Sequence, residues 1–537
     1  MIHSAGAVVT HQGASQRSAA VTVLIPAALF AAVLAYVSLG VTMDHLQPMD
    51  NLHHRVIDEY VIFADLRDMY DALMRGAWAE FLNIRLKAYG SVYVLGSFLI
   101  SLPFLAINSI DAAVYSLRSM SLLLGAGAIG MLSLWAWRAT GQITAGLFVG
   151  LAAMSCTGFW IIASWIHPDV LMALFVLVAT LYAGGREGPM RFRQIAVCAL
   201  LYALALASKF QAAIYMAGVV VAIALNTLGE HPAQVRRLVI NLASFGALLA
   251  VFYVLLNPFF FIPGGASSYF DQLLSTMASN ATGHFMFVKI PLSEKIASLE
   301  YFYGSIVGYG ALVAVAALAL THLRPGPVRI TAISLLAMSA TSFAYLLITL
   351  NKAGVFAYYY YLSYLALLPV AAVSISSGIV NRRLAAFLLF LIPIIMLVAS
   401  SGIKASLLAK DLADSTRFRA GSEPLERALR PIVDARTTIV ISPYTPLRGT
   451  AIGLDYRRLR IIWGYLDNHY AQLGDLLVLR KNDVYFERER PPADDIAARQ
   501  YNVAREYVEQ IRSGNDADFR PCGETDRVYI FCRRPPR

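Results

Sequence analysis

The sequence predicts an α-helical polytopic membrane protein with about eleven transmembrane helices, juxtamembrane helices in its first external loop, and a small C-terminal soluble α/β domain. Three observations predict this fold class. Of the 537 residues, 58% are hydrophobic and only 15% are charged, far outside the range of a soluble globular protein. Apolar runs that can cross about 30 Å of hydrocarbon recur before residue 404. The last quarter of the chain holds 42 of its 78 charged residues and no such run.

The expected spans follow one another through the first 403 residues. Runs of spanning length lie at about 22–41, 112–137, 143–163, 238–257, 302–321, 329–349, 358–379 and 384–403, with shorter candidates near 169–184, 194–208 and 212–227. The first run follows Arg17 and has no small-residue cleavage site after it. We therefore expect it to be an uncleaved anchor rather than a signal peptide.

The basic residues predict the orientation, because cytoplasmic loops retain Lys and Arg. Arg residues occupy alternate loops: Arg138, Arg186, Arg191, Arg193, Arg236, Arg237, Arg324, Arg329, Arg382 and Arg383. The alternation holds if 91–107 does not cross the membrane, so we interpret that segment as a juxtamembrane or re-entrant helix; a twelfth span is the alternative. The pattern predicts a multi-pass protein of the plasma (bacterial inner) membrane, with a cytoplasmic N-terminus and a periplasmic or extracellular C-terminal domain.

Two domains are expected. Residues 1–403 form the transmembrane domain, with its first external loop at about 42–111, and 404–537 form the soluble domain. In the latter, "TTIVIS", "RLRIIWGYL", "DLLVLRKNDV" and "RVYIFCRR" are typical of strands, and "DDIAARQYNVAREYVEQIRSG" is typical of an amphipathic helix. Cys522 and Cys532 flank the turn "GETD". Outside the cytoplasm they would form a disulfide or remain two free thiols.

Acidic residues gather in the first external loop. Eight of the 15 that precede residue 404 lie within 37 consecutive positions: Asp44, Asp50, Asp58, Glu59, Asp65, Asp68, Asp71 and Glu80. Asp65, Asp68 and Asp71 recur at helical spacing, which predicts the solvated face of an amphipathic helix. Asp58 and Glu59 begin the segment near the membrane. Such a pair can deprotonate an acceptor hydroxyl or hold a divalent cation, Mg²⁺ or Mn²⁺, against a phosphate.

Further polar side chains lie at the predicted external boundary of the spans and are candidates for substrate binding: Arg85, Lys87, Tyr89, Tyr93, His167, Asp169, Lys209, His284, Lys352 and Tyr360. An ionisable residue within apolar sequence is a functional candidate by default. For the run of Tyr that includes Tyr360, an aromatic belt is the alternative. Because the cytoplasmic loops offer only short Arg-bearing turns, we expect a lipid-linked anionic substrate rather than a soluble cytoplasmic nucleotide.

Several function classes are disfavoured by the same sequence. The net charge of +10 is spread over loops and the soluble domain, so orientation signals explain it better than binding of nucleic acid does. The chain has no Gly-rich phosphate loop, no Ser-nucleophile elbow and no metal-binding spacing of Cys and His.

The order of these features resembles a known family. After a first span come "DEYV" in the external loop, "YGSVY", "SLRSMSLLLGAGAIGMLSLWAWRATGQ", "SWIHPDVLMALFVLVATLY", "ALASKFQ" and a late "YYYYLSYLALLPVAA". Over about 22–400 this order is similar to that of membrane-integral glycosyltransferases of GT-C architecture. That group includes protein O-mannosyltransferases and the aminoarabinose transferase of lipid A. The soluble tail resembles the small external domain often appended to such enzymes. The Pro-rich "kPPl" of many members is replaced here by "KAYGS".

The resemblance implies an inverting transfer of a hexosyl or pentosyl group. The donor would be a polyprenyl-phosphate sugar, and the acceptor would be a glycan, a lipid or a protein at the external face. It implies Asp58 as the catalytic or metal-associated carboxylate, with Glu59 beside it as a second carboxylate. It also implies that Lys87 or Arg85 binds the lipid phosphate and that Lys209 approaches it. Because the leaving phosphate is a stable anion, one carboxylate base is sufficient.

Three alternatives remain open at this point. A transporter or flippase of an envelope lipid or sugar would use the same carboxylates and Lys as relay or gating groups, but it predicts mid-membrane charges and repeated halves. A non-catalytic scaffold for envelope assembly is the second. The third is a lipid-linked oligosaccharide transferase, whose donor would be a pyrophosphate.

Overall fold

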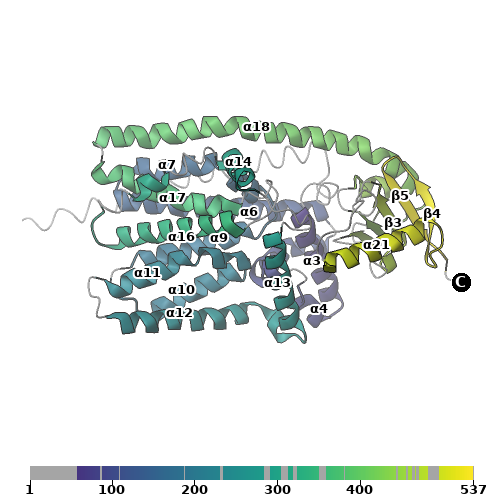
Figure 1. Ribbon diagram of the computed structural model, residues 1–537, viewed down its shortest axis with the longest axis horizontal. Coiled ribbons are helices and arrows are strands. Elements are labelled where there is room, and N and C mark those ends of the chain that lie inside the picture. The colour runs from purple at the N-terminus through teal and green to yellow at the C-terminus, as the bar shows by residue number, and fades with distance from the viewer. Residues whose placement is uncertain are drawn as a thin grey trace, which may run out of the picture.

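The computed structural model describes residues 57–84, 87–107, 109–186, 188–229, 234–282, 291–303, 312–317, 323–349, 359–379, 381–442, 445–454, 458–462, 466, 471–481 and 495–535. It has two parts, a bundle of long helices and a sheet domain beyond one end of that bundle (Figure 1). We call the end of the bundle beside the sheet domain the domain end, and the opposite end the far end.

The bundle is built from α6 (Ile110–Thr140), α7 (Ile143–Ser155), α8 (Thr157–Ser164), α9 (Asp169–Gly184), α10 (Phe192–Leu206), α11 (Ala217–Leu228), α12 (Val235–Leu256), α16 (Pro327–Thr349), α17 (Tyr361–Ser374), the π-helical turn η7 (Ile375–Ile379) and the first half of α18 (Arg382–Leu429). Within the described residues, five helices are long and apolar enough to span a membrane, or six if α7 and α8 form one broken span. A polytopic helical membrane fold is thus confirmed, whereas the number eleven remains a prediction. The expected anchor at 22–41 lies outside the described residues.

One expected span is broken. Cys156 separates α7 from α8 with an extended backbone, and its thiol sulfur accepts the Phe159 N–H at 3.4 Å to cap α8. The two helices bend by 74° at this break. The run 143–163, expected as one continuous span, is therefore two helices, because the extended backbone of Cys156 ends α7 and makes this residue the N-cap of α8.

Small and polar residues let the bundle helices approach one another. Gly184 of α9 lies so close to Thr331 of α16 that an added Cβ would be 2.5 Å from the Thr331 hydroxyl. Ser339 of α16 donates a hydrogen bond to the Ser363 carbonyl of α17 at 2.7 Å. Such contacts are typical of helices that pack in lipid, where apolar burial gives little preference for one neighbour over another.

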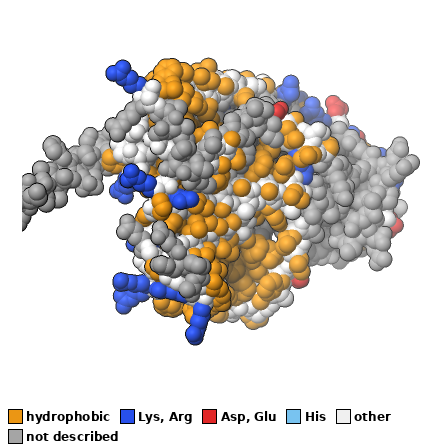
Figure 2. Space-filling model, turned by 60° about the vertical axis from the view of Figure 1, so that its left-hand side comes forward, with side chains coloured by type: hydrophobic (Ala, Val, Ile, Leu, Met, Phe, Trp, Pro, Cys, Tyr) orange, Lys and Arg blue, Asp and Glu red, His pale blue; other side chains and the backbone are white. Residues whose placement is uncertain are grey.

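The outer surface of the bundle is suited to lipid. In Figure 2 hydrophobic side chains cover its side, and Lys and Arg side chains project from its far end. On α12 and α18 the exposed apolar residues include Val235, Val239, Ile240, Val251, Leu255, Phe387, Phe390, Ile395 and Val398. A continuous apolar surface of this kind is what a membrane-embedded helix presents.

Shorter helices gather at the domain end. They are α3 (Ile57–Met74), α4 (Trp78–Leu82), η1 (Lys87–Tyr89), α5 (Ser91–Ala106), η2 (Phe210–Tyr215), η4 (Pro258–Phe261), α13 (Gly265–Thr282) and α14 (Leu292–Tyr303). The 16-residue α5 packs against α3 and α6 and is shorter than the helices of spanning length. The juxtamembrane or re-entrant role of 91–107 remains a prediction, because α9 of the bundle is also 16 residues long.

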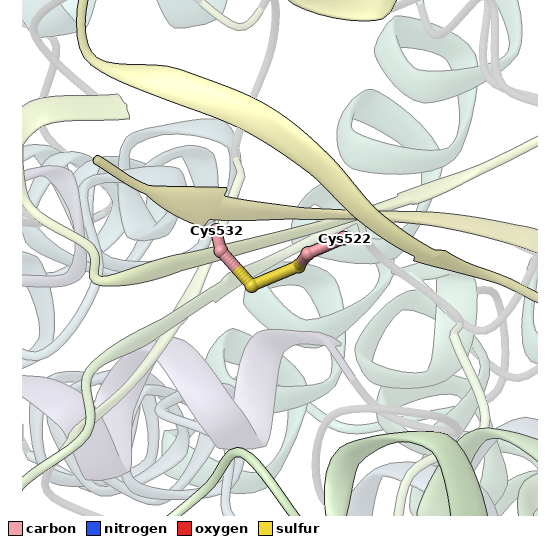
Figure 3. Close-up of a disulfide and its surroundings, with 2 residues drawn as sticks. All are labelled: Cys522 and Cys532. Carbon is pink, nitrogen blue, oxygen red and sulfur yellow. A yellow bond between two sulfur atoms is a disulfide. The ribbon is translucent and has the colours of Figure 1, made fainter.

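The sheet domain contains β1 (Ile439–Ile441), η8 (Gly449–Ile452), β2 (Leu459–Ile461), β3 (Leu476–Arg480), α21 (Asp495–Arg512), β4 (Phe519–Glu524) and β5 (Val528–Arg533). The strand order is β2-β1-β3-β5-β4, with β1 parallel to β2 and β3 and with β5 antiparallel to β3 and β4. The four expected strands and the helix are confirmed. The sequence did not predict β4, whose "FRPCGE" contains Pro and Gly, two residues that disfavour strands. Cys522 and Cys532 form a disulfide between β4 and β5 (Figure 3), so the free-thiol alternative is wrong.

The two parts share one buried apolar cluster. Phe63 and Leu66 of α3 belong to it together with Leu425 and Leu429 of α18 and Ile441 of β1. The helix α18 runs along the bundle and on to the sheet domain, through residue 404 without a break (Figure 1). The sheet domain is therefore packed onto α3 as well as attached through α18.

Candidate functional site

The first turn of α3 carries the predicted carboxylate pair. Glu59 is fully buried, and its two carboxylate oxygens accept hydrogen bonds from the Arg118 guanidinium of α6 at 3.0 and 2.6 Å. It also accepts the Ile166 backbone N–H at 2.8 Å. Glu59 thus ties α3 to α6 and to the segment before α9. Asp58 lies in the same turn of α3, and its side chain is outside the described residues.

The expected solvated face of α3 needs a correction. Asp65 is buried, with 3% of its surface exposed, and Asp68 and Asp71 are half-buried. The buried Arg67 guanidinium donates to Asp68 Oδ1 at 2.9 Å. The helix α3 packs in an apolar cluster that includes residues of the sheet domain, and Arg460 of β2 borders the same cavity as the three carboxylates.

Lys87 lies in η1 and is 4% exposed. Its ammonium donates to Ser268 Oγ of α13 at 3.1 Å, and its backbone N–H donates to Gln272 Oε1 at 3.0 Å. Just after it, the Ser91 N–H donates to the buried Asn257 Oδ1 at 3.1 Å. Burial lowers the pKa of Lys87, and the charge of Asp65 partly offsets that effect. Side chains from α13 and from the end of α12 therefore hold the η1 turn in place.

A second polar cluster adjoins η1 and draws its residues from four segments. Lys209 Nζ lies 2.8 Å from Asp169 Oδ2, and His167 Nδ1 contacts the same oxygen. The Lys209 ammonium also lies 5.5 Å from the centre of the Tyr89 ring and 4.8 Å from that of Tyr359. Four of the predicted residues, His167, Asp169, Lys209 and Tyr89, are thus brought together.

This cluster adjoins both Lys87 and Glu59. Tyr89 is two residues from Lys87 in η1, and its ring lies 5.9 Å from that of His167. Ile166, whose N–H binds Glu59, directly precedes His167. The first turn of α3, η1 and the start of α9 therefore meet in one region at the domain end.

The remaining predicted residues fall in three groups. Tyr93 is fully buried in α5, within electrostatic range of Glu59 and Asp169. Tyr360 is buried against Phe343 of α16, with ring centres 5.4 Å apart. The others lie outside the described residues: Arg85, His284 and Lys352.

Sequence reasoning missed four residues at this site. Arg118 had a usable signal, because a lone Arg inside a long apolar run requires a buried partner. Ser268 and Gln272 had none, since neutral polar residues on a loop helix are ordinary. Tyr359 lies in the run of four Tyr from which the sequence singled out only Tyr360 as a candidate for substrate binding.

The expected metal role of the carboxylate pair does not fit Glu59. Both of its oxygens already accept from a guanidinium, and a second cation beside Arg118 would be repelled. Over the described residues, no group of three or more His, Cys, Asp or Glu could hold a metal ion. We therefore derive no step through a metal.

No family model and no curated protein sequence matches the chain. Two crystal structures of ArnT from Cupriavidus metallidurans are similar to it. The structure bound to undecaprenyl phosphate has a TM-score of 0.52 and 13% identity, covering 94% of this chain and 97% of that chain. The structure in the apo state has a TM-score of 0.56 and 12% identity, covering 95% and 97%. This chain has the fold of a GT-C membrane glycosyltransferase.

The GT-C fold accounts for the whole arrangement and not for the bundle alone. The sequence resemblance covers about 22–400, whereas the similarity in structure covers nearly the entire chain, the sheet domain included. At these identities the similarity concerns the fold. The chemistry must be argued from the residues of this chain.

Proposed function

We propose that the protein transfers a hexosyl or pentosyl group from a polyprenyl-phosphate donor to an acceptor hydroxyl, with inversion at the anomeric carbon. The observation that carries this proposal is the meeting of Lys87, the His167–Asp169–Lys209 cluster and the first turn of α3 at one end of a GT-C fold. A similar fold, that of ArnT, has been crystallised with undecaprenyl phosphate.

Lys87 is the better candidate for the donor phosphate. Its ammonium faces a neutral hydroxyl, that of Ser268, which a phosphate oxygen can replace with a gain in charge pairing. Lys209 is already paired with Asp169 at 2.8 Å. In the proposal Lys209 therefore positions Asp169 and the Tyr89 ring, and Lys87 binds the phosphate.

Asp58 is the proposed base, and Glu59 is a positioning residue. The acceptor oxygen forms a bond to the anomeric carbon as the bond from that carbon to the phosphate oxygen breaks. The hydroxyl proton passes to Asp58, and polyprenyl phosphate leaves as an anion paired with Lys87. The ion pair of Glu59 with Arg118 fixes the first turn of α3, which contains Asp58.

The proposed reaction takes place outside the cytoplasm. Lys and Arg side chains project from the far end (Figure 2), and such residues favour the cytoplasmic side. The Cys522–Cys532 disulfide lies in the sheet domain beyond the opposite end, and disulfides persist in extracytoplasmic compartments. Both observations support a periplasmic or extracellular sheet domain.

The test is sugar transfer by membranes that contain the Asp58→Asn protein, supplied with radiolabelled polyprenyl-phosphate sugars. Loss of a general base typically lowers the rate by about 10²- to 10⁴-fold, so we expect a loss of at least about 100-fold. Asp271→Asn, an exposed carboxylate on α13, is the matched control and should keep parental activity. Equal transfer by Asp58→Asn and the parent would show that Asp58 is not the base.

A further inference from the structure

The helix α13 has an exposed apolar side. Phe270, Leu274 and Met277 are 55%, 64% and 52% exposed. Their spacing of four and three residues places them on one side of an α-helix. Large apolar side chains that are exposed next to one another mark a surface that binds another apolar surface. The mechanism proposed above gives this side of α13 no role.

The opposite side of α13 holds the Lys87 turn. Ser268 and Gln272, one helical turn apart, accept hydrogen bonds from the Lys87 ammonium at 3.1 Å and from its backbone N–H at 3.0 Å. Phe270 and Leu274 each follow one of these polar residues by two positions, which at about 100° per residue is about 160° away around the helix axis. The helix is therefore amphipathic, and the phosphate candidate lies on its polar side.

Aromatic contacts join α13 to the end of α12. The Tyr253 hydroxyl of α12 donates to the hydroxyl of the buried Tyr269 at 2.8 Å, and the Tyr269 ring lies 5.5 Å from that of Phe259 in η4. The helix α12 is one of those long and apolar enough to span a membrane. Figure 1 shows α13 crossing the direction of α12 at the domain end. Thus α13 lies where a candidate span ends.

The apolar side of α13 continues the lipid-suited surface of α12 along the chain. Val251 and Leu255 are exposed in the last turns of α12, and Phe261 of η4 is exposed between them and Phe270. This continuity favours lipid as the occupant over a protein partner. An amphipathic helix with such an apolar side lies in the plane of the membrane interface, with that side in the lipid.

We infer that α13 lies in the membrane interface at the domain end, with Phe270, Leu274 and Met277 in the lipid, and that the bilayer thereby positions Lys87. Rotation of α13 about its axis would bring these three side chains into water and its polar side toward hydrocarbon, and both changes are unfavourable. The phosphate of a polyprenyl lipid lies in the same interface. Only the phosphate role of Lys87 in this inference rests on the proposed function; the membrane contact does not.

The first experiment measures the surroundings of single spin labels on the full-length protein in nanodiscs of phosphatidylethanolamine and phosphatidylglycerol. Leu274→Cys and its matched control Thr276→Cys are both at exposed positions, about 160° apart around α13. The native cysteines do not interfere, because Cys156 and Cys198 are buried and the other two are bridged. Oxygen concentrates in lipid and a nickel chelate in water. The ratio of their collision rates with the label should be higher for Leu274→Cys than for Thr276→Cys.

Two results for the Leu274→Cys label would overturn the membrane contact. A ratio equal to or lower than that of Thr276→Cys would show that the apolar side does not enter the lipid. Low collision rates with both reagents would show that a protein surface covers it instead. Neither measurement requires turnover.

A charged substitution tests whether the membrane contact positions Lys87. Leu274→Asp opposes insertion into lipid, and it should raise the half-saturating mole fraction of undecaprenyl phosphate in nanodiscs at least about tenfold. Thr276→Asp adds the same charge on the other side of α13 and should keep the parental value, as should the apolar Leu274→Phe. An unchanged value in Leu274→Asp, or an equal rise in Thr276→Asp, would show that the contact does not position Lys87.

The two experiments separate this inference from the proposed function. A parent protein that binds no undecaprenyl phosphate and transfers no sugar would refute the proposed function, whereas the spin-label ratio would still decide the membrane contact. A parent that binds and transfers, together with a Leu274→Asp variant that binds equally well, would refute the positioning of Lys87 by the bilayer and leave the proposed function intact.

Discussion

Two buried ion pairs, Glu59 with Arg118 and Asp169 with Lys209, hold charge at the domain end. Taking such charges out of water is costly, and the pairing offsets the cost only while both partners are present. Each pair also joins segments far apart in the sequence. Their contribution is therefore geometric as much as energetic, because each fixes where a neighbouring segment can lie.

Glu59→Gln should destabilise the protein. Removing one partner of a buried pair typically costs about 3–5 kcal/mol, because the other charge is left without compensation. The measurement is thermal unfolding in detergent, with the exposed Glu294→Gln on α14 as the control. We expect a clearly lower unfolding temperature for Glu59→Gln and no change for Glu294→Gln. An unchanged unfolding temperature combined with lost transfer would instead indicate that Glu59 takes part in the chemistry.

Lys87 should give donor binding a characteristic pH dependence. Burial lowers its pKa below 10.5 despite the opposing charge of Asp65, and only the protonated form carries the charge that pairs with phosphate. The KM for the donor should therefore rise as the pH increases through a value below 10.5. Lys87→Ala should raise this KM at neutral pH at least about tenfold and abolish the pH dependence, since charged hydrogen bonds contribute about 1.5–3 kcal/mol.

Ser268 offers a finer test of the same site. Ser268→Ala should change the donor KM by a few-fold and leave kcat unchanged, because the hydroxyl positions the Lys87 ammonium without touching the reacting atoms. Ser267→Ala is the matched control, since the exposed Ser267 hydroxyl donates to the Gly264 carbonyl within its own helix turn. Equal donor KM values for both variants and the parent would remove Ser268 from the site.

Individual site residues could be proposed from the sequence, but their partners could not. His167, Asp169 and Lys209 were noticed because ionisable groups are rare in apolar sequence. That all three meet at one carboxylate oxygen depends on how α9 and the turn before η2 pack, which no local pattern encodes.

At the scale of elements, α3 shows the limit of periodicity. Its acidic spacing correctly indicated a helix, and the same spacing suggested a solvated face. Periodicity reports which residues share a face and gives no information about what covers it. The helix α3 shares an apolar cluster with the sheet domain, more than 350 residues later in the sequence, and Asp65 is 3% exposed.

The junction of α18 with the sheet domain should weaken in acid. Burial alone would raise the pKa of Glu426, but hydrogen bonds from Arg448 and Ser422 and the charge of Arg448 outweigh burial, so the pKa is lowered below 4.5. The stabilisation is present above pH 4.5 and is lost as the pH falls through the lowered pKa. Two Arg448 hydrogen bonds at 2.7 and 2.6 Å carry it.

Glu426→Gln should remove the part of the acid sensitivity of the unfolding temperature that arises from the protonation of Glu426. The unfolding temperature of the variant should already be reduced at pH 7 and should fall less steeply than that of the parent between pH 5 and pH 3. Glu423→Gln, at an exposed position one turn earlier on α18, should follow the parent curve. Parallel pH profiles for Glu426→Gln and the parent would contradict the assignment.

At the scale of the molecule, the helical membrane fold and the small C-terminal sheet could be predicted, because both follow from composition and local pattern. The number of spans could not be predicted from hydropathy alone. Hydropathy does not register a break such as the one at Cys156. The order of the five strands likewise depends on contacts between distant segments.

The disulfide provides a test of membrane orientation. In intact spheroplasts, a membrane-impermeant maleimide should label Cys522 and Cys532 only after treatment with an impermeant reductant. The double variant Cys522→Ser, Cys532→Ser is the control and should remain unlabelled, because Cys156 and Cys198 are buried. Labelling that appears only after the cells are broken would place the sheet domain in the cytoplasm and overturn the proposed orientation.

The 48-residue helix α18 sets the rotational phase of the sheet domain as well as its height. An α-helix turns by about 100° and rises about 1.5 Å per residue. Deleting a single residue beyond the membrane would rotate Arg460 away from α3, whereas deleting seven, close to two whole turns, would restore its direction at a height about 10 Å lower. Length changes in this helix therefore keep Arg460 beside α3 only in steps of nearly whole turns, and only where the lower height can be accommodated.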